Sequence, residues 1–282
     1  MKWAVFNQKG GVGKTSIACN LAATFARKGR KVLVVDLDSQ CNSSHYLLGS
    51  SMEQVTNTIA DFFSSTLSFK LFKNSLIDAI YETPYEGLSV VPSDPDLKDL
   101  QPKLEGRYKI FKLGEAIDAV AEKLGYDDVF FDTPPALNFY SMSSLIAAER
   151  VLIPFDCDAF SADAILNVMD VVDEVSSDHR PNLSVHGVII NQFQAQAKLP
   201  KQTIDALLSD GLAVLTPYLS SSVVMRESHS AGVPLPFYRS THKLTQEFSR
   251  LADSLIEAEK ALLGEKKKPA RKKAAKETSK ES

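Results

Sequence analysis

Cysteine and tryptophan are scarce in this chain, and long apolar runs are missing. The three cysteines, Cys19, Cys41 and Cys157, are too few and too scattered for a disulfide framework or a zinc site, so we expect free thiols in a reducing cytoplasm. No apolar run approaches the ~18 residues of a membrane span. The apolar stretch at residues 3–6 is also too short for a signal peptide, because polar residues follow it at once. The sequence therefore predicts a cytoplasmic protein.

A large excess of charge is also missing from the chain as a whole. The 282 residues include 32 Lys and Arg and 35 Asp and Glu, and the net charge of -3 excludes a globally basic nucleic-acid coat. The content of 44% hydrophobic and 24% charged residues is typical of a soluble globular protein. The average conceals an asymmetry, because residues 265–282 hold seven Lys and one Arg against three Glu. This segment carries +5, and the remaining body carries -8.

Apolar runs and segments with helical spacing alternate along the chain. The spacing predicts strands at 3–6, 31–36, 88–92, 128–132, 150–154, 185–190 and 213–216, and helices at 14–28, 110–124, 159–175 and 241–263. This alternation predicts an α/β fold, a doubly wound and mainly parallel sheet flanked by helices. We expect one domain, residues 1–264, followed by a Lys-rich tail, residues 265–282, that is disordered when free. Residues 51–86 carry no motif, and we expect a variable helical insert there that is available to a partner.

A glycine-rich loop joins the first predicted strand to the first predicted helix. It reads Lys9-Gly-Gly-Val-Gly-Lys-Thr15. Glycines let backbone amides converge on phosphate oxygens, and the helix N-terminus adds a favourable dipole. In such a P-loop, Lys14 reaches the β- and γ-phosphates and Thr15 places its hydroxyl on Mg²⁺. The strict pattern is not met, because Gln8 replaces its first glycine and a second lysine, Lys9, opens the loop. The predicted nucleotide-binding residues are Gly10, Gly11, Val12, Gly13, Lys14, Thr15 and Ser16.

The chain resembles the ParA/MinD family of ATPases, whose loop is a deviant Walker A motif. The matching segments are the loop itself, Val35-Asp36-Leu37-Asp38-Ser39-Gln40, Phe131-Asp132-Thr133-Pro134-Pro135, Ile190-Asn191, and the stretch from Met225 to Pro234. The resemblance covers about residues 1–260, and it implies the P-loop NTPase fold. The sequence departs from the family at Ser39, where proline is usual. This difference loosens the loop but leaves both neighbouring carboxylates in place.

The resemblance implies three catalytic residues. Lys14 binds phosphate, and Asp38 positions or activates the attacking water. Lys9 is the family's signature lysine, which crosses a dimer interface to the nucleotide of the other protomer. There it stabilises charge on the transferred phosphoryl group, as an arginine finger does elsewhere.

The resemblance also implies a Mg²⁺ site and a base contact. Thr15 ligates Mg²⁺, while Asp36 and Asp132 hold its shell, mostly through water, and Asn191 contacts adenine. The residue types agree, because Mg²⁺ prefers hydroxyl, carboxylate and water oxygens. In doubly wound sheets the ligand also lies outside the carboxyl ends of the strands, where both aspartates are expected.

Other candidate chemistry is weak in this sequence. His179, His186, His229 and His242 lack a Cys or carboxylate partner at ligand spacing, and we interpret them as ordinary surface or core residues. The guanine-binding pattern N-K-x-D is absent, which favours ATP over GTP.

The tail distinguishes between two branches of the family. ParA-type members bind DNA as ATP dimers, whereas MinD-type members bind membrane through an amphipathic helix. Residues 265–282 contain no Leu, Ile, Val, Phe or Trp, so the tail favours contact with a phosphate backbone over membrane insertion. A solvated tail without a function is the alternative. The predicted DNA-binding residues are Arg226, which matches a family position, and Lys243, Arg250, Lys266, Lys267, Lys268, Arg271, Lys272 and Lys273.

With the resemblance, the sequence predicts a Mg²⁺-dependent ATPase that forms a homodimer on ATP and binds non-specific DNA at the nucleoid. It would position or partition a cargo, with hydrolysis stimulated by a ParB-like or other adaptor protein and no stable membrane association. Two alternatives remain open, a MinD-like membrane-associated regulator and an ATP-dependent metabolic or metal-cluster assembly enzyme. The last ranks lowest, because Cys19 and Cys41 form no C-x-x-C pair.

Overall fold

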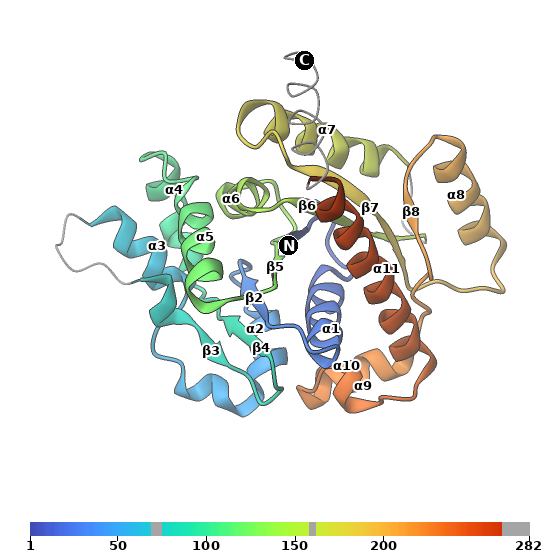
Figure 1. Ribbon diagram of the computed structural model, residues 1–282, viewed down its shortest axis with the longest axis horizontal. Helices are drawn as coiled ribbons and strands as arrows, with labels where there is room; N and C mark the ends of the chain where they lie inside the picture. Colours follow the sequence, from blue (N-terminus) through green and yellow to red (C-terminus); the bar gives the residue numbers. More distant parts are fainter. Residues whose placement is uncertain (69–74, 158–161, 267–282) are drawn as a thin grey trace, which may run out of the picture.

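An eight-stranded sheet forms the centre of the computed structural model, which describes residues 1–68, 75–157 and 162–266 (Figure 1). In order across the sheet, the strands are β3 (Tyr81–Glu82), β4 (Leu88–Val91), β2 (Val32–Asp36), β5 (Asp128–Asp132), β1 (Lys2–Val5), β6 (Arg150–Asp156), β7 (Ser184–Asn191) and β8 (Val214–Leu215). Neighbouring strands are parallel except β3, which runs antiparallel to β4. This order confirms the predicted doubly wound, mainly parallel sheet.

Helices cover both faces of the sheet. One face packs against α1 (Lys14–Arg27), α2 (Asn42–Leu48), α9 (Val223–Ala231), α10 (Leu235–Tyr238) and α11 (Lys243–Lys266). The other face packs against α3 (Ile59–Leu67), α4 (Leu97–Glu105), α5 (Lys112–Leu124), α6 (Phe139–Ala147), α7 (Ala162–Asp178) and α8 (Lys198–Ser209). Two 3₁₀ turns, η1 (Gly49–Gln54) and η2 (Leu76–Ala79), complete the described elements. Figure 1 shows α1 and α11 side by side.

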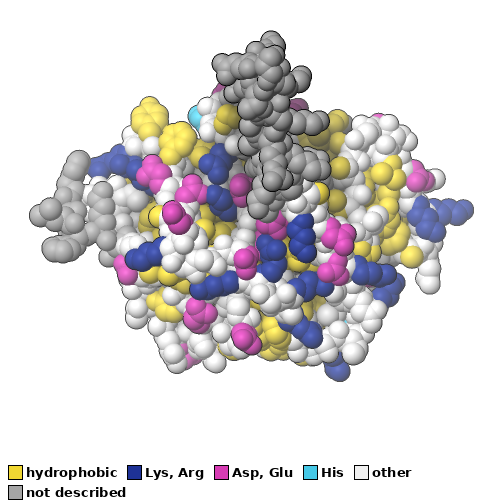
Figure 2. Space-filling view, viewed as in Figure 1, with side chains coloured by type: hydrophobic (Ala, Val, Ile, Leu, Met, Phe, Trp, Pro, Cys, Tyr) yellow, Lys and Arg dark blue, Asp and Glu magenta, His cyan; other side chains and the backbone are white. Residues whose placement is uncertain are grey.

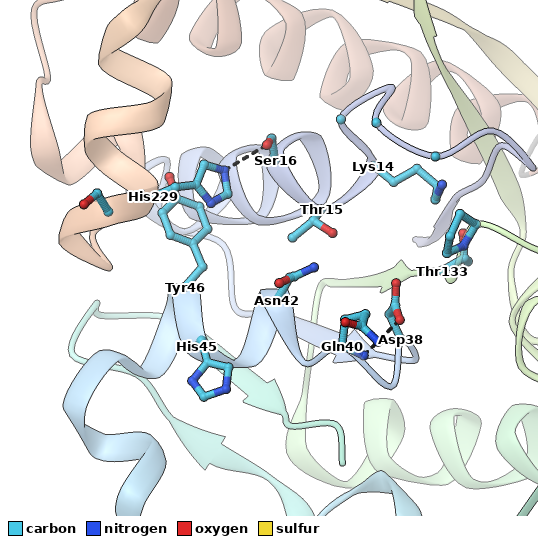
Figure 3. A pocket seen from close by; sticks show the side chains of 15 residues that line it. Lys14, Thr15, Ser16, Asp38, Gln40, Asn42, His45, Tyr46, Thr133 and His229 are labelled. Atoms are coloured by element: carbon cyan, nitrogen blue, oxygen red, sulfur yellow. Dashed lines mark hydrogen bonds between the residues drawn. The ribbon is translucent and has the colours of Figure 1, made fainter. Parts of the chain in front are cut away.

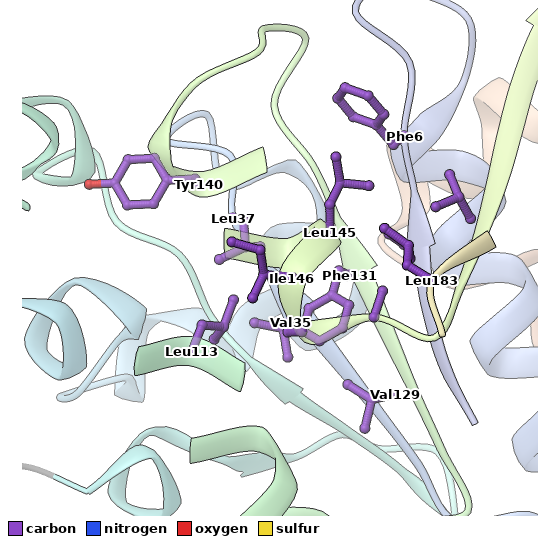
Figure 4. Close-up of a cluster of buried hydrophobic side chains, with 14 of the residues drawn as sticks. Phe6, Val35, Leu37, Leu113, Val129, Phe131, Tyr140, Leu145, Ile146 and Leu183 are labelled. Atoms are coloured by element: carbon purple, nitrogen blue, oxygen red, sulfur yellow. The ribbon is translucent and has the colours of Figure 1, made fainter. Parts of the chain in front are cut away.

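Alternation along the strands builds two separate cores. On β2, Leu33 and Val35 join the core under α5 and α6, whereas Val32 and Val34 join the core under α1 and α11. Figure 4 shows the first of these cores, with Val35 beside Phe131 of the neighbouring strand. Because successive side chains of a strand point to opposite faces, a continuous apolar run fits a strand that is covered on both sides.

The predicted strands are all present, with ends that differ by at most two residues. The predicted helix ends at Gly29 and Gly125 are also confirmed, since both glycines adopt positive φ angles, 81° and 70°. The strand β3 and the helices α2, α4, α6, α8, α9 and α10 were not predicted from the sequence.

Three predicted segments differ from the structure. In the described parts of 51–86, which are 51–68 and 75–86, α3 is the only α-helix and β3 adds an edge strand, so these parts are not helical throughout. The last helix begins at Lys243 and passes Gly264 to end at Lys266, since one glycine does not stop a helix. The predicted start at residue 159 lies outside the described residues, and α7 continues past 175 to Asp178. Among the described helices, not one combines the length and the apolarity that crossing a membrane requires.

Candidate nucleotide site

The site lies at the carboxyl ends of three adjacent strands, β2, β5 and β1. The sheet register pairs Asp36 with Asp132 and pairs Val5 with Asp132. The loop that follows β1 therefore starts beside both carboxylates. The strand order alone brings together segments that are about a hundred residues apart in sequence.

The glycine loop curls back on itself before α1. Gly11 and Gly13 have φ angles of 79° and 93°, values that side chains rarely allow. Lys14 is buried, and its Nζ donates a hydrogen bond to the main-chain oxygen of Lys9 at 2.9 Å. Burial lowers the pKa of Lys14, while the charges of Asp132 and Asp38 oppose that shift. The lysine is thus held inside the loop, where its ammonium group can meet an anion.

A cavity of about 770 Å³ opens over this loop. Lys14 and Thr15 line it from α1, and Asp38 lines it from the segment after β2 (Figure 3). Asp38 is half-buried, and its Oδ1 accepts a hydrogen bond from the main-chain N–H of Gln40 at 3.0 Å. The side chain of Lys9 is exposed at the start of the loop. The structure therefore brings together the predicted catalytic residues, and their roles stay predictions.

Asp36 and Asp132 form a buried acidic pair with 0% exposure. Asp132 Oδ2 accepts hydrogen bonds from Thr15 Oγ1 at 2.7 Å and from Ser43 Oγ at 2.6 Å. Burial raises the pKa of both carboxyl groups, and repulsion by Asp132 adds to the shift of Asp36. Among the described residues, Asp132 Oδ1 is a buried oxygen without a hydrogen-bond partner. An unpaired carboxylate oxygen beside a threonine hydroxyl fits a Mg²⁺ ion, which prefers such ligands.

Helix α2 supplies two hydroxyl groups that the sequence analysis missed. Ser43 binds Asp132, and Ser44 donates from its main-chain N–H and its Oγ to Asp36 Oδ2, at 2.9 and 2.7 Å. Both serines are buried. The available signal was their spacing, because they follow Asp36 by seven and eight residues, directly after the acidic motif.

Asn191, at the end of β7, lies against the loop rather than apart from it. Its Nδ2 donates to the main-chain oxygen of Val12 at 2.9 Å. A Cβ on Gly13 would fall 2.2 Å from the same nitrogen, and the φ angle of 93° would strain any side chain, so this position favours glycine. Asn191 also lines a second cavity of about 450 Å³, together with Ser222 and Arg226. The predicted adenine contact stays a prediction, and this second cavity is the space available for it.

The predicted DNA-binding residues are spread over two helices and the tail. Arg226 on α9 and Arg250 on α11 are exposed. Lys243 is 70% exposed and forms an ion pair with Glu247 at 3.6 Å. Helix α11 ends at Lys266, whose side chain is not described. Lys267, Lys268, Arg271, Lys272 and Lys273 lie outside the described residues.

His229 lies at the site, contrary to its interpretation as an ordinary surface or core residue. Its Nε2 is 2.8 Å from Ser16 Oγ in the first turn of α1, and it lines both cavities. Tyr46 of α2 lies beneath the imidazole ring. The sequence signal was its position inside the segment from Met225 to Pro234, which carries part of the resemblance.

A phosphate-binding glycine loop, a buried lysine and strand-end carboxylates on a parallel sheet define a P-loop nucleoside triphosphatase. Comparison with known proteins narrows this class. Residues 2–185 match the AAA_31 family, described as an AAA domain. The chromosome partitioning protein ParA of Caulobacter vibrioides is 29% identical over 259 residues, which cover 91% of this chain and 94% of that protein. The chain belongs to the ParA/MinD family of P-loop ATPases.

Solved structures agree with this fold. A cobyrinic acid a,c-diamide synthase from Mycobacterium smegmatis, with bound ATP analogue and magnesium, superposes with a TM-score of 0.77 and 22% identity, covering 92% of this chain and 95% of that one. A variant of McdA from Cyanothece, solved in complex with ATP, superposes with a TM-score of 0.75 and 22% identity. The match covers 90% of this chain and 95% of that one. At these identities the likeness shows the fold alone.

Proposed function

We propose that this protein is a Mg²⁺-dependent ATPase that dimerises on ATP, binds DNA without sequence preference and positions or partitions a cargo. The observation that carries the proposal is the cavity over the glycine loop, with buried Lys14 inside the loop, Asp38 beside it and exposed Lys9 at its start. Full-length similarity to a chromosome partitioning ParA supports the partition branch.

The residues present fit ATP and Mg²⁺. The loop amides and Lys14 hold phosphate oxygens, and Thr15, Asp36 and Asp132 surround the place for the metal. When bound, Mg²⁺ neutralises charge on the phosphates. Asp38 lies in the same cavity with one carboxylate oxygen accepting from Gln40, and it orients the attacking water.

Lys9 acts across a dimer interface. Its main chain is fixed by two hydrogen bonds, from its N–H to Asn7 Oδ1 and from Lys14 Nζ to its oxygen, both 2.9 Å long. Its side chain is exposed. A fixed backbone with an exposed side chain suits a residue that enters the nucleotide site of the other protomer.

DNA binding follows from exposed cations of α9 and α11 and from the tail. Arg226 and Arg250 contact phosphates from the body, residues 1–264, and the tail, residues 265–282, adds its net charge of +5. The resulting dimer is nucleoid-associated, and a ParB-like or other adaptor protein stimulates its hydrolysis. Membrane association is not part of the proposal, because the tail lacks the apolar face that insertion requires.

A co-sedimentation assay with non-specific duplex DNA tests the proposal. We expect binding with ATP and Mg²⁺, weaker binding with ADP, and retention of DNA by Asp38→Ala, because that variant keeps ATP unhydrolysed. Lys14→Ala should bind neither nucleotide nor DNA, and Arg250→Ala, at a position that lines neither cavity, should bind nucleotide normally but DNA more weakly.

The same assay separates the alternatives. Sedimentation with anionic vesicles instead of DNA would favour a MinD-like regulator. ATP turnover without any effect of DNA or vesicles would favour a metabolic enzyme on this fold. A metal-cluster carrier is disfavoured by the burial of Cys19, Cys41 and Cys157.

A further inference from the structure

The imidazole ring of His229 joins three helices at the nucleotide site. His229 belongs to α9, its Nε2 lies 2.8 Å from Ser16 Oγ of α1, and its ring stacks on Tyr46 of α2. The two ring centroids are 3.9 Å apart and the planes differ by 17° (Figure 3). The ring is half-buried and borders both cavities beside the glycine loop.

The imidazole ring of His229 stacks on Tyr46, whose own position is fixed by hydrogen bonds. The hydroxyl group of Tyr46 donates to Asn20 Oδ1 at 3.2 Å and lies 2.5 Å from Ser228 Oγ. Asn20 Oδ1 also accepts from the main-chain N–H of Leu235 at 2.7 Å. Tyr46 is thereby tied to α1, to α9 and to the start of α10. Because the imidazole ring stacks on this fixed tyrosine, its Nε2 edge is oriented toward Ser16.

The hydrogen-bonding capacity of Ser16 makes this contact directional. A serine hydroxyl has one proton to donate, and a phosphate oxygen offers only lone pairs. A phosphate oxygen at the first turn of α1 therefore takes the Ser16 proton, and Ser16 Oγ can then only accept from its other neighbour. Neutral His229 meets that need when its proton is on Nε2. The resulting chain, from Nε2–H to the hydroxyl to phosphate, strengthens each bond in it.

We propose that His229 is a positioning residue of the nucleotide site. It orients the Ser16 hydroxyl toward a nucleotide phosphate, and this contact connects the nucleotide-bound site to α9. The inference rests on the proposed binding of nucleotide at the glycine loop. Because α9 also carries Arg226, this contact links the nucleotide to the proposed DNA face through one helix. Ser16 is the only side chain through which His229 acts in this proposal.

Nucleotide affinity of the full chain, measured by calorimetry with ADP and Mg²⁺, tests this contact. His229→Ala should weaken binding about fivefold, the factor that one ordinary hydrogen bond contributes. His229→Gln should recover most of the loss, because its amide nitrogen can donate to Ser16 from a similar place. Ser16→Ala should weaken ADP binding at least as much as His229→Ala. The double variant, Ser16→Ala/His229→Ala, should bind ADP no more weakly than the weaker-binding single variant, because both changes remove the same interaction.

A second half-buried histidine supplies the matched control. His186 on β7 lies edge-on to the ring of Trp3 at 5.3 Å and lines neither of the two cavities beside the loop. His186→Gln should bind ADP like the unaltered chain. The Ser16→Ala variant keeps the test open if His229→Ala fails to fold.

Three outcomes would overturn the assignment: unaltered affinity in His229→Ala, equal losses in the Ala and Gln variants, or additive losses in the double variant. Each would mean that His229 does not act through Ser16. Failure of the unaltered chain to bind ADP is a different result, because it removes the proposed nucleotide binding itself.

Discussion

Asp36 and Asp132 occupy paired positions on β2 and β5, so the fold buries two like charges side by side. Their raised pKa values mean that the native protein retains protons that the unfolded chain releases near pH 4. Between that pH and the raised values, the native state binds more protons than the unfolded state. The free energy of unfolding therefore falls as pH rises through this window.

We predict that Asp132→Asn flattens this pH dependence in the metal-free protein. Removing one charge relieves Asp36 of its neighbour, and each unit of pKa shift removed corresponds to about 1.4 kcal/mol. Between pH 5 and pH 8, the free energy of unfolding measured with urea should decrease in both proteins. The decrease in Asp132→Asn should be smaller than in the unaltered chain by roughly 1–2 kcal/mol. Asp173→Asn, at an exposed position of α7, is the control and should follow the unaltered curve. If the free energy of unfolding of Asp132→Asn varied with pH as it does in the unaltered chain, the proposed interaction between Asp36 and Asp132 would be contradicted.

Residue patterns in the sequence identified the charged groups of the site but not their supports. Lys14, Thr15, Asp36 and Asp132 were predictable because each stands at a strand end or in a loop of fixed form. The hydroxyls of α2 and the imidazole of His229 reach the site only through helix packing. Local periodicity carries no information about which helix surfaces meet, so these contacts required the structure.

At the scale of elements, α11 holds the polar segment beside the second cavity. Glu247 is buried at 4% exposure, and its carboxylate accepts from the main-chain N–H and from Oγ of Ser220, both at 2.8 Å. Ser220 precedes the Ser222 cap of α9. The carboxylate thereby fixes the start of the helix that carries Arg226 and His229.

We predict that Glu247→Ala destabilises the protein by about 1–3 kcal/mol, because it leaves the partly buried main-chain N–H of Ser220 without its partner. Lys243→Ala removes the exposed partner of the same carboxylate and should cost less than about 1 kcal/mol. Urea unfolding of the two variants measures the difference. Equal losses would mean that the ion pair, and not the bond to Ser220, accounts for the role of Glu247.

Three of the elements that escaped prediction, α4, α6 and β3, have sequences that do not favour their local structure. Helix α4 contains Pro102, which cannot donate to the preceding turn, and α6 is rich in serine. Helix α6 is also buried on nearly all sides, so it lacks the periodic apolar stripe that marks a surface helix. Strand β3 is two residues long and forms only by pairing with β4. Tertiary packing selects these conformations, whereas the long strands were predictable from apolar runs.

At the scale of the whole molecule, charge is divided between body and tail. On the face in Figure 2, basic and acidic side chains are interleaved. The ion pairs among the described residues include Lys28 with Asp253 and Arg30 with Glu259. The tail, with its net charge of +5, is expected to add to the proposed DNA contacts of Arg226 and Arg250.

We predict that deleting residues 265–282 reduces the salt dependence of DNA binding. The slope of log K against log salt should become shallower by about 0.9 for each lost phosphate contact, on the order of 4–5 for each protomer of the dimer, given a net charge of +5 in each tail. Fluorescence anisotropy at several salt concentrations measures the slope. A tail of equal length with its Lys and Arg replaced by Gln should behave like the deletion, and an unchanged slope would identify the tail as a solvated segment.

Both edges of the sheet end in short strands, β3 and β8, each two residues long. Edge strands with unpaired backbone groups are templates on which further chains can add, and shortness is one protection against this. In the DNA-bound state that we propose, copies of this protein would meet at high local concentration. With so little free edge, they can crowd together without extending one another's sheets into aggregates.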